Sequence, residues 1–205
     1  MVVGPEHDEI RSRYSVGEES ARLPITFLVQ EEARGTADAV LAAEAWAGSD
    51  PFVVVNADNL YPVGVLQALA ALDGPGLPVF EREELVRTSN IPAARVAAFA
   101  LLTIDETGYL AGIAEKPGAE AFEAAGDRAP VSMNCWRFDR RIFDACRDVP
   151  RSARGEFELP EAVALAVRRG VRFRAVPGRG EVLDLSRRSD VAEVSRRLAG
   201  PVSRS

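Results

Sequence analysis

Short apolar runs rich in Val, Ile and Phe recur along the chain, and helical periodicity follows most of them. This alternation is typical of an α/β domain in which helices cover both faces of a largely parallel sheet. We expect strands near residues 25–29, 52–56, 96–104, 110–114, 131–138, 171–176 and 182–185. We expect helices near residues 5–13, 37–46, 63–72, 81–87, 140–147, 160–169 and 189–198, and loops at 74–78 and 118–130, the second with a short helix.

The 205 residues are enough for one α/β domain with its own core. We predict that this domain covers residues 1–199 and that residues 200–205, rich in Ser and Arg, form a flexible tail. Met1, Val2 and Val3 resemble the last residues of a buried strand. The sequence therefore predicts a domain whose first strands are missing.

Composition favours a small-molecule partner. A formal charge of -6 gives no general attraction to nucleic acid or to an anionic membrane, and no apolar run is long enough to span a bilayer. Cys135 and Cys146 are predicted to be buried reduced thiols of a cytoplasmic protein. Because His7 is the only histidine, the sequence gives little support to a His-based zinc site or a Ser-His-Asp triad.

Two acidic residues follow predicted strands. Asp58 comes after the apolar run at 52–55, and Asp184 ends the run at 182–185. Ligands of open parallel sheets bind at the carboxyl ends of strands, and Mg²⁺ usually takes one or two carboxylates. The pair therefore predicts a shared Mg²⁺ site, although either residue could instead cap the helix or turn that follows it.

Lys116 is the only lysine of the chain, and all other cationic side chains except the single histidine are arginines. It follows Glu115 at the end of a predicted strand, and Pro117 ends the strand because proline has no N–H to give. Lysine is a compact charge suited to a phosphate that moves during a reaction. A solvated surface lysine is the alternative interpretation.

Two further segments place polar groups next to helix starts. Gln30 begins a polar loop that ends at Gly35 and Thr36, where backbone N–H groups could meet an anion or a base edge. Thr36 could equally be a helix N-cap. Glu156 and Glu158 precede the helix expected at 160–169, where they could accept hydrogen bonds from hydroxyls or, as we prefer for Glu158, cap the helix.

In order, these segments resemble the sugar-1-phosphate nucleotidyltransferase family. The residues that carry the resemblance are Gln30 with Gly35 to Val40, Phe52 to Asn59, Glu115-Lys116-Pro117, Val131 to Asn134 with Phe138-Asp139, Gly155 to Leu159, and Asp184. The resemblance implies a Rossmann-like three-layer α/β/α sandwich with a mostly parallel mixed sheet. It also implies that a nucleoside triphosphate and a sugar 1-phosphate react with Mg²⁺ to give a nucleotide-sugar and pyrophosphate.

The resemblance also assigns roles. Gln30, Gly35 and Thr36 would bind the nucleotide. Asp58 and Asp184 would bind the metal, and Lys116 with Asp58 would be catalytic. Glu115, Asn134 and Glu156 would face the sugar.

One family feature has no counterpart in this sequence, namely a Gly-x-Gly-x-Arg loop that cradles the triphosphate. We therefore expect this polypeptide to lack appreciable nucleotidyl transfer and to associate, with homo-oligomers one outcome, through uncovered strands. A non-catalytic sugar-phosphate-binding relative and a glycosyltransferase of similar fold are the alternative functions.

Overall fold

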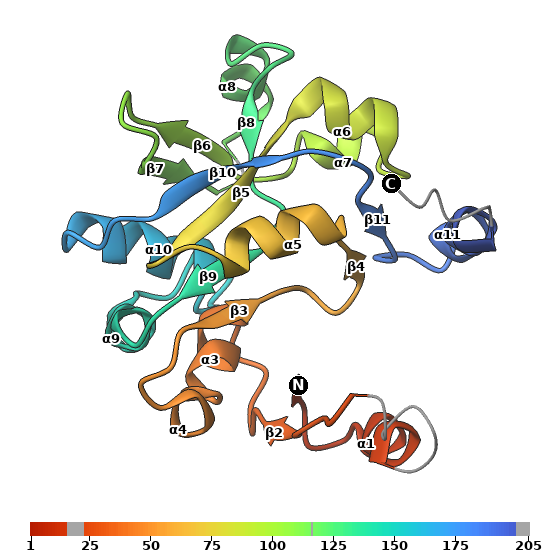
Figure 1. The fold of residues 1–205 in the computed structure, drawn as a ribbon, viewed down its shortest axis with the longest axis vertical. Coiled ribbons are helices and arrows are strands. Elements are labelled where there is room, and N and C mark those ends of the chain that lie inside the picture. Colours follow the sequence, from red (N-terminus) through yellow and green to blue (C-terminus); the bar gives the residue numbers. More distant parts are fainter. Residues whose placement is uncertain (16–22, 116, 200–205) are drawn as a thin grey trace. The chain divides into compact units, whose positions relative to one another are not determined.

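A computed structural model of the protein describes residues 1–15, 23–115 and 117–199 (Figure 1). Lys116 and the tail expected at 200–205 lie outside these residues. The chain divides into two units, one made of residues 1–50 and 140–166, the other of residues 51–139 and 167 onward. None of the helices described is long and apolar enough to cross a bilayer.

The first unit contains a small parallel sheet and a group of helices. Its elements are β1 (Val2–Val3), α1 (Asp8–Ser15), β2 (Leu28–Val29), α3 (Thr36–Leu41), α4 (Glu44–Ala47), α9 (Arg141–Asp148) and the start of α10 (Leu159–Arg168). β1 pairs with β2, so Val2-Val3 is a strand as predicted. α3 packs against α9, and the two helices bury Ala37, Val40, Ile142 and Phe143.

The second unit holds the main sheet. Its strands are β3 (Phe52–Val54), β4 (Asn59–Leu60), β5 (Gly76–Glu81), β6 (Leu101–Ile104), β7 (Leu110–Ala114), β8 (Pro130–Val131), β9 (Trp136–Phe138), β10 (Arg174–Gly178) and β11 (Leu183–Asp184). Its helices are α5 (Val63–Ala70), α6 (Arg82–Thr88), α7 (Ala93–Val96), α8 (Ala119–Ala124) and α11 (Asp190–Ala199). The strand order is β3-β9-β5-β8-β6-β7 with β10 beside β5, and β4 pairs separately with β11.

The fold is α/β with a mixed sheet, as predicted, but the expectation of a mostly parallel sheet is wrong for the strands that the structure describes. Among the described strands of the main sheet, β10 and β5 are the one pair of neighbours that is parallel. The pairs β3–β9, β5–β8, β5–β9, β6–β7 and β6–β8 are antiparallel. Helix α5 lies across β5, β9 and β10 and covers one face of this sheet (Figure 1).

The prediction of a loop at 74–78 is wrong, because β5 begins at Gly76. A Cβ on Gly76 would lie 2.3 Å from Leu72 Cδ1 and 2.7 Å from the Arg174 carbonyl oxygen, so β10 approaches closely only because position 76 is glycine. Pro78 lies between the residues that pair with β9 and β8, where its missing N–H is tolerated.

Several predicted strands are shorter than expected, and for two of them the backbone shows why. Residues 93–96 form α7, so the strand predicted at 96–104 begins only at Leu101. The strand predicted at 131–138 is interrupted after Val131 because Asn134 has φ 53°, a left-handed conformation that no strand accommodates. Cys135 and Cys146 are free and buried, as predicted. The helix expected at 160–169 forms as α10, and Gly170 follows its end with φ 86°.

Candidate functional site

Asp58 and Asp184 lie in one neighbourhood of the second unit. β4 and β11 pair antiparallel and bring Asn59 opposite Asp184, and Leu185 N–H donates to the Asp58 carbonyl at 2.8 Å. The Ser186 hydroxyl lies 2.5 Å from Asp184 Oδ1 and 3.4 Å from Asp58 Oδ2. Both carboxylates therefore reach the same hydroxyl, although they come from opposite ends of the second unit's sequence.

The Asp184 carboxylate is almost completely buried. Ser186 N–H donates to Oδ1 at 2.7 Å, and Arg95 donates to Oδ2 at 3.1 Å. The Asn90 side-chain amide pairs with the backbone N–H and carbonyl of Asp184 at 2.8 and 2.7 Å. The side chain of Asp184 is therefore held in one position. Through Ser186 N–H it also holds the turn that follows β11, but it does not extend to α11, which begins at Asp190, so it does not cap that helix.

The two carboxylates suit a hard divalent cation. Asp58 is exposed, whereas Asp184 is buried and held by its hydrogen bonds. Across the part of the chain that the structure describes, no three His, Cys, Asp or Glu side chains gather into a metal-binding group. Mg²⁺ commonly uses one or two protein carboxylates and completes its shell with phosphate and water, which fits this pair.

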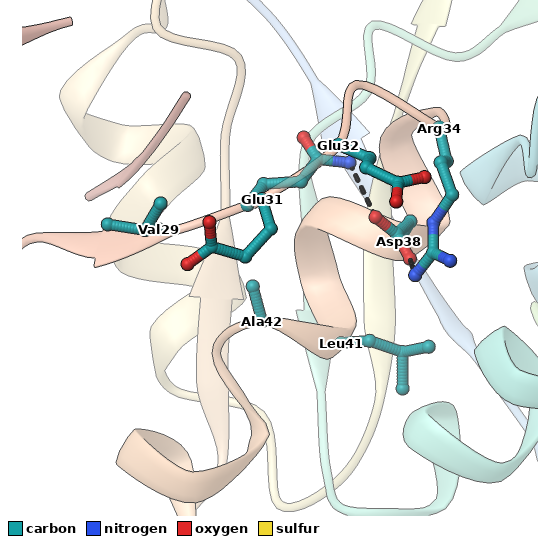
Figure 2. A pocket seen from close by; sticks show the side chains of 8 residues that line it. Val29, Glu31, Glu32, Arg34, Asp38, Leu41 and Ala42 are labelled. Atoms are coloured by element: carbon teal, nitrogen blue, oxygen red, sulfur yellow. Dashed lines mark hydrogen bonds and ion pairs between the residues drawn. The ribbon is translucent and has the colours of Figure 1, made fainter. Parts of the chain in front are cut away.

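The residues predicted to bind the nucleotide lie together in the first unit. Gln30 follows β2, and its side-chain N–H groups donate to the Gly35 carbonyl at 3.1 Å and to Asp38 Oδ2 at 2.8 Å. Asp38 Oδ1 accepts from Arg34 at 2.7 Å (Figure 2). Burial raises the pKa of Asp38, but the hydrogen bonds from Arg34 and Gln30 outweigh burial, and the net pKa lies below its ordinary value.

A pocket of about 330 Å³ opens beside this network. Figure 2 shows the charged side chains of Glu31, Arg34 and Asp38 above the apolar floor made by Leu41 and Ala42. The pocket therefore combines hydrogen-bonding groups with an apolar surface, as small-molecule sites commonly do.

Gly35 lies next to the backbone of Phe157, which is far from it in the sequence. With φ 120° and ψ 174° it is the N-cap of α3, and a Cβ there would lie 2.5 Å from the Phe157 carbonyl oxygen. Ala37 N–H donates to that oxygen at 2.9 Å, and Phe157 N–H donates to the Arg34 carbonyl at 2.8 Å. This contact places Glu156, a predicted sugar-binding residue, next to the predicted nucleotide-binding loop.

Thr36 is not the N-cap of α3. Its hydroxyl accepts a hydrogen bond from Leu159 N–H at 2.8 Å and so joins the starts of α3 and α10. Glu158 is buried and accepts from Arg154 at 3.0 Å, whereas Glu156 is half-buried and 3.6 Å from the same guanidinium.

The other two predicted sugar-binding residues belong to the second unit. Asn134 is the one non-glycine residue with positive φ among those described, and non-glycine residues in this conformation often mark functional turns. Tyr61 fixes this turn by donating from its buried hydroxyl to the Met133 carbonyl at 2.6 Å. Glu115 directly follows β7 and is half-buried.

The sequence analysis did not identify Arg95, Ser186 or Tyr61 as site residues. In the structure Arg95 and Ser186 contact the Asp184 carboxylate, and Tyr61 holds the turn at Asn134. Ser186 lies two residues after Asp184, a spacing at which hydroxyls often bond an Asp side chain, so it could have been found. Arg95 could not, because its sequence neighbours give no sign that its side chain meets β11.

Comparison with known proteins places the chain in a family. The family model for nucleotidyl transferases matches residues 1–199. A glucose-1-phosphate thymidylyltransferase of Streptomyces antibioticus is 27% identical, and the match covers 96% of this chain and 51% of that protein. The UTP–glucose-1-phosphate uridylyltransferase AglF of Haloferax volcanii is 25% identical, with 97% and 76% covered.

Among solved structures, a UDP-glucose pyrophosphorylase complexed with UDP-glucose superposes with a TM-score of 0.73 at 17% identity. The match covers 96% of this chain and 78% of that chain and shows a shared fold. The chain spans about half the length of the Streptomyces relative. Because the family model matches almost every residue, the chain belongs to the nucleotidyl transferase family.

Proposed function

We propose that this protein transfers a nucleotidyl group from a nucleoside triphosphate to a sugar 1-phosphate, giving a nucleotide-sugar and pyrophosphate. The observation that carries the proposal is the approach of Asp58 and Asp184 to one hydroxyl within a chain that matches the nucleotidyl transferase family over residues 1–199. The names of the relatives support glucose 1-phosphate with UTP or dTTP as the first substrates to test.

In the proposed reaction a phosphate oxygen of the sugar 1-phosphate attacks the α-phosphorus of the triphosphate. A new P–O bond forms as the bond to pyrophosphate breaks, and catalysis is mainly positioning and charge neutralisation. Asp58 and Asp184 would hold a divalent cation, proposed to be Mg²⁺, which when bound neutralises phosphate charge. Lys116 would hold the sugar phosphate, an assignment that rests on sequence resemblance.

The first unit would bind the base. The Gln30 amide nitrogen donates to Gly35 and Asp38, which leaves the amide oxygen as the acceptor that a uracil or thymine N3–H would meet. Gly35 would contact the base through its backbone, and Thr36 would keep the loop in place through Leu159. Glu156, Asn134 and Glu115 are proposed to accept hydrogen bonds from sugar hydroxyls.

Product formation tests the proposal. Purified protein is incubated with Mg²⁺, UTP or dTTP and glucose 1-phosphate, and the nucleotide-sugar is separated by chromatography. Asp58→Asn should lower kcat/KM by about 100-fold or more, the usual loss on removing an electrostatic contact to the transition state. Asp73→Asn is the control, because Asp73 is an exposed acid of the same unit. Equal activities of the two variants beside an active parent would contradict the role of Asp58. An inactive parent would agree with the expected lack of appreciable transfer, and the binding test then decides whether the site is present.

Binding gives a second test that does not depend on turnover. Lys116→Ala should weaken glucose 1-phosphate binding, measured by calorimetry, by about 1.5 to 3 kcal/mol, the range for a charge-assisted hydrogen bond. Lys116→Arg should recover only part of the loss, because a planar fork does not replace a point charge. Unchanged affinity in Lys116→Ala would remove Lys116 from the site. Binding without any product would favour a non-catalytic relative.

A further inference from the structure

Arg95 lies between two acidic side chains that come from different elements. From α7 its guanidinium donates to Asp184 Oδ2 at 3.1 Å and to both oxygens of Asp190 at 3.0 and 3.1 Å. The three side chains are only 13%, 3% and 10% exposed for Arg95, Asp184 and Asp190. Water therefore screens these charges weakly, and they act strongly on one another.

Among the buried side chains of this cluster, one guanidinium faces two carboxylates next to the exposed carboxylate of Asp58. The exposed side chain of Arg187 supplies a second positive charge that acts on Asp190, so the excess of negative charge is confined to the buried groups. Asp190 Oδ2 also accepts from Arg187 N–H at 2.9 Å, which fixes Asp190 at the start of α11. Arg95 is thus shared between a carboxylate of the proposed metal pair and one that no observation assigns to the metal.

We propose that Arg95 and Asp190 are positioning residues that set the affinity of the Asp58–Asp184 pair for a divalent cation, Arg95 lowering it and Asp190 raising it. The inference rests on the proposed function, because it takes the pair to be the metal site. A cation that binds Asp184 approaches the Arg95 guanidinium and is repelled by it. Asp190 offsets that repulsion and draws Arg95 away from Asp184.

The two residues therefore have opposite effects on the affinity. Arg95→Gln removes a positive charge and releases Asp184 Oδ2, so the affinity for a cation should rise. Asp190→Asn leaves Asp184 as the main counter-ion of Arg95, so the affinity should fall. A purely structural role predicts a different result, since loss of either partner would loosen the contacts among α7, β11 and α11 and weaken binding in both variants.

Calorimetric titration with Mn²⁺ alone, at low salt and neutral pH, measures these effects without turnover. Relative to the parent, Arg95→Gln should bind Mn²⁺ roughly three- to tenfold more tightly, and Asp190→Asn more weakly by a similar factor. Asp58→Asn should abolish binding. Arg82→Gln, which removes the 2.6 Å ion pair with Glu123 elsewhere in the same unit, is the matched control and should leave the affinity unchanged.

The double variant Arg95→Gln/Asp190→Asn keeps the test decisive if Arg95→Gln does not fold. It removes one positive and one negative charge, so its Mn²⁺ affinity should return to near that of the parent and above that of Asp190→Asn. If Asp190→Asn and the double variant bind equally, or if both single variants weaken binding, the inference is wrong while the metal pair stands. If the parent and every variant fail to bind Mn²⁺, the metal pair itself is wrong, and the inference fails with it.

Discussion

Replacing Gly35 with alanine tests whether this residue is required by the fold before any ligand binds. A Cβ at position 35 would lie 2.5, 2.7 and 2.9 Å from the carbonyl oxygen, nitrogen and carbonyl carbon of Phe157. These are backbone atoms, so no side-chain rotation relieves the overlap. The Phe157 segment would have to move away from the start of α3.

The expected cost has two parts. A non-glycine residue at φ 120° and ψ 174° costs about 1 to 3 kcal/mol. Displacing Phe157 also breaks the hydrogen bonds between Ala37 N–H and the Phe157 carbonyl and between Phe157 N–H and the Arg34 carbonyl, each worth about 1 kcal/mol. Gly35→Ala should therefore lower the free energy of unfolding by about 3 to 5 kcal/mol.

Gly118→Ala is the matched control. Gly118 is also a helix N-cap with positive φ, at φ 83° and ψ 158°, but no atom of the described residues lies within 4 Å of the position of its Cβ. Urea unfolding followed by far-ultraviolet circular dichroism should show that Gly35→Ala is less stable than Gly118→Ala by about 2 kcal/mol. Equal losses in the two variants would refute the argument that the Phe157 contact requires glycine.

Three further outcomes are expected. Because the pKa of Asp38 lies below its ordinary value, its ionised form stabilises the fold above about pH 4, and protonation removes that contribution as the pH falls through the lowered pKa. Asp38→Asn should therefore destabilise the protein in urea at pH 7 and flatten the acid side of its stability profile; an unchanged profile would contradict the pairing with Arg34. Burial raises the pKa of Cys135 and Cys146 to about 12, so a disulfide reagent at pH 8 should label them rapidly only after unfolding, and rapid labelling of the native protein would count against their burial. Asn134→Gly should keep the melting temperature, since glycine accepts φ 53°, but should weaken glucose 1-phosphate binding in calorimetry, and unchanged binding would remove the Asn134 side chain from the sugar site.

Most helices and the outer strands could be predicted from local pattern. The apolar run at 110–114 is β7 at the predicted bounds, and α10 differs from its predicted range by one residue. β5 could not be predicted, because glycine and proline normally indicate a loop. Position 76 requires glycine because the backbone of Arg174 lies against it. Arg174 is almost a hundred residues further along the chain, so no local sequence window contains both residues.

The candidate site could likewise be predicted only in part. Asp58 and Asp184 were expected to lie together, and the structure brings both to the Ser186 hydroxyl. The reason differs from the rule for parallel strands, because β4 and β11 pair antiparallel outside the main sheet. Arg95 belongs to α7, a helix that was not expected and that ends at the first residue of the strand predicted at 96–104, so its side chain could not be placed from sequence. The metal and substrate roles stay predictions for the experiments above.

The division of the first unit into residues 1–50 and 140–166 has a consequence for synthesis. α3 packs against α9, and Gly35 meets Phe157, so neither contact can form until the later segment leaves the ribosome. At about 5 to 20 residues per second, the residues between the two segments take on the order of 5 to 20 s to translate. During that interval Ala37 and Val40 lack the surface that buries them in the finished fold. During that interval the segment proposed to bind the nucleotide is therefore open to chaperones and proteases.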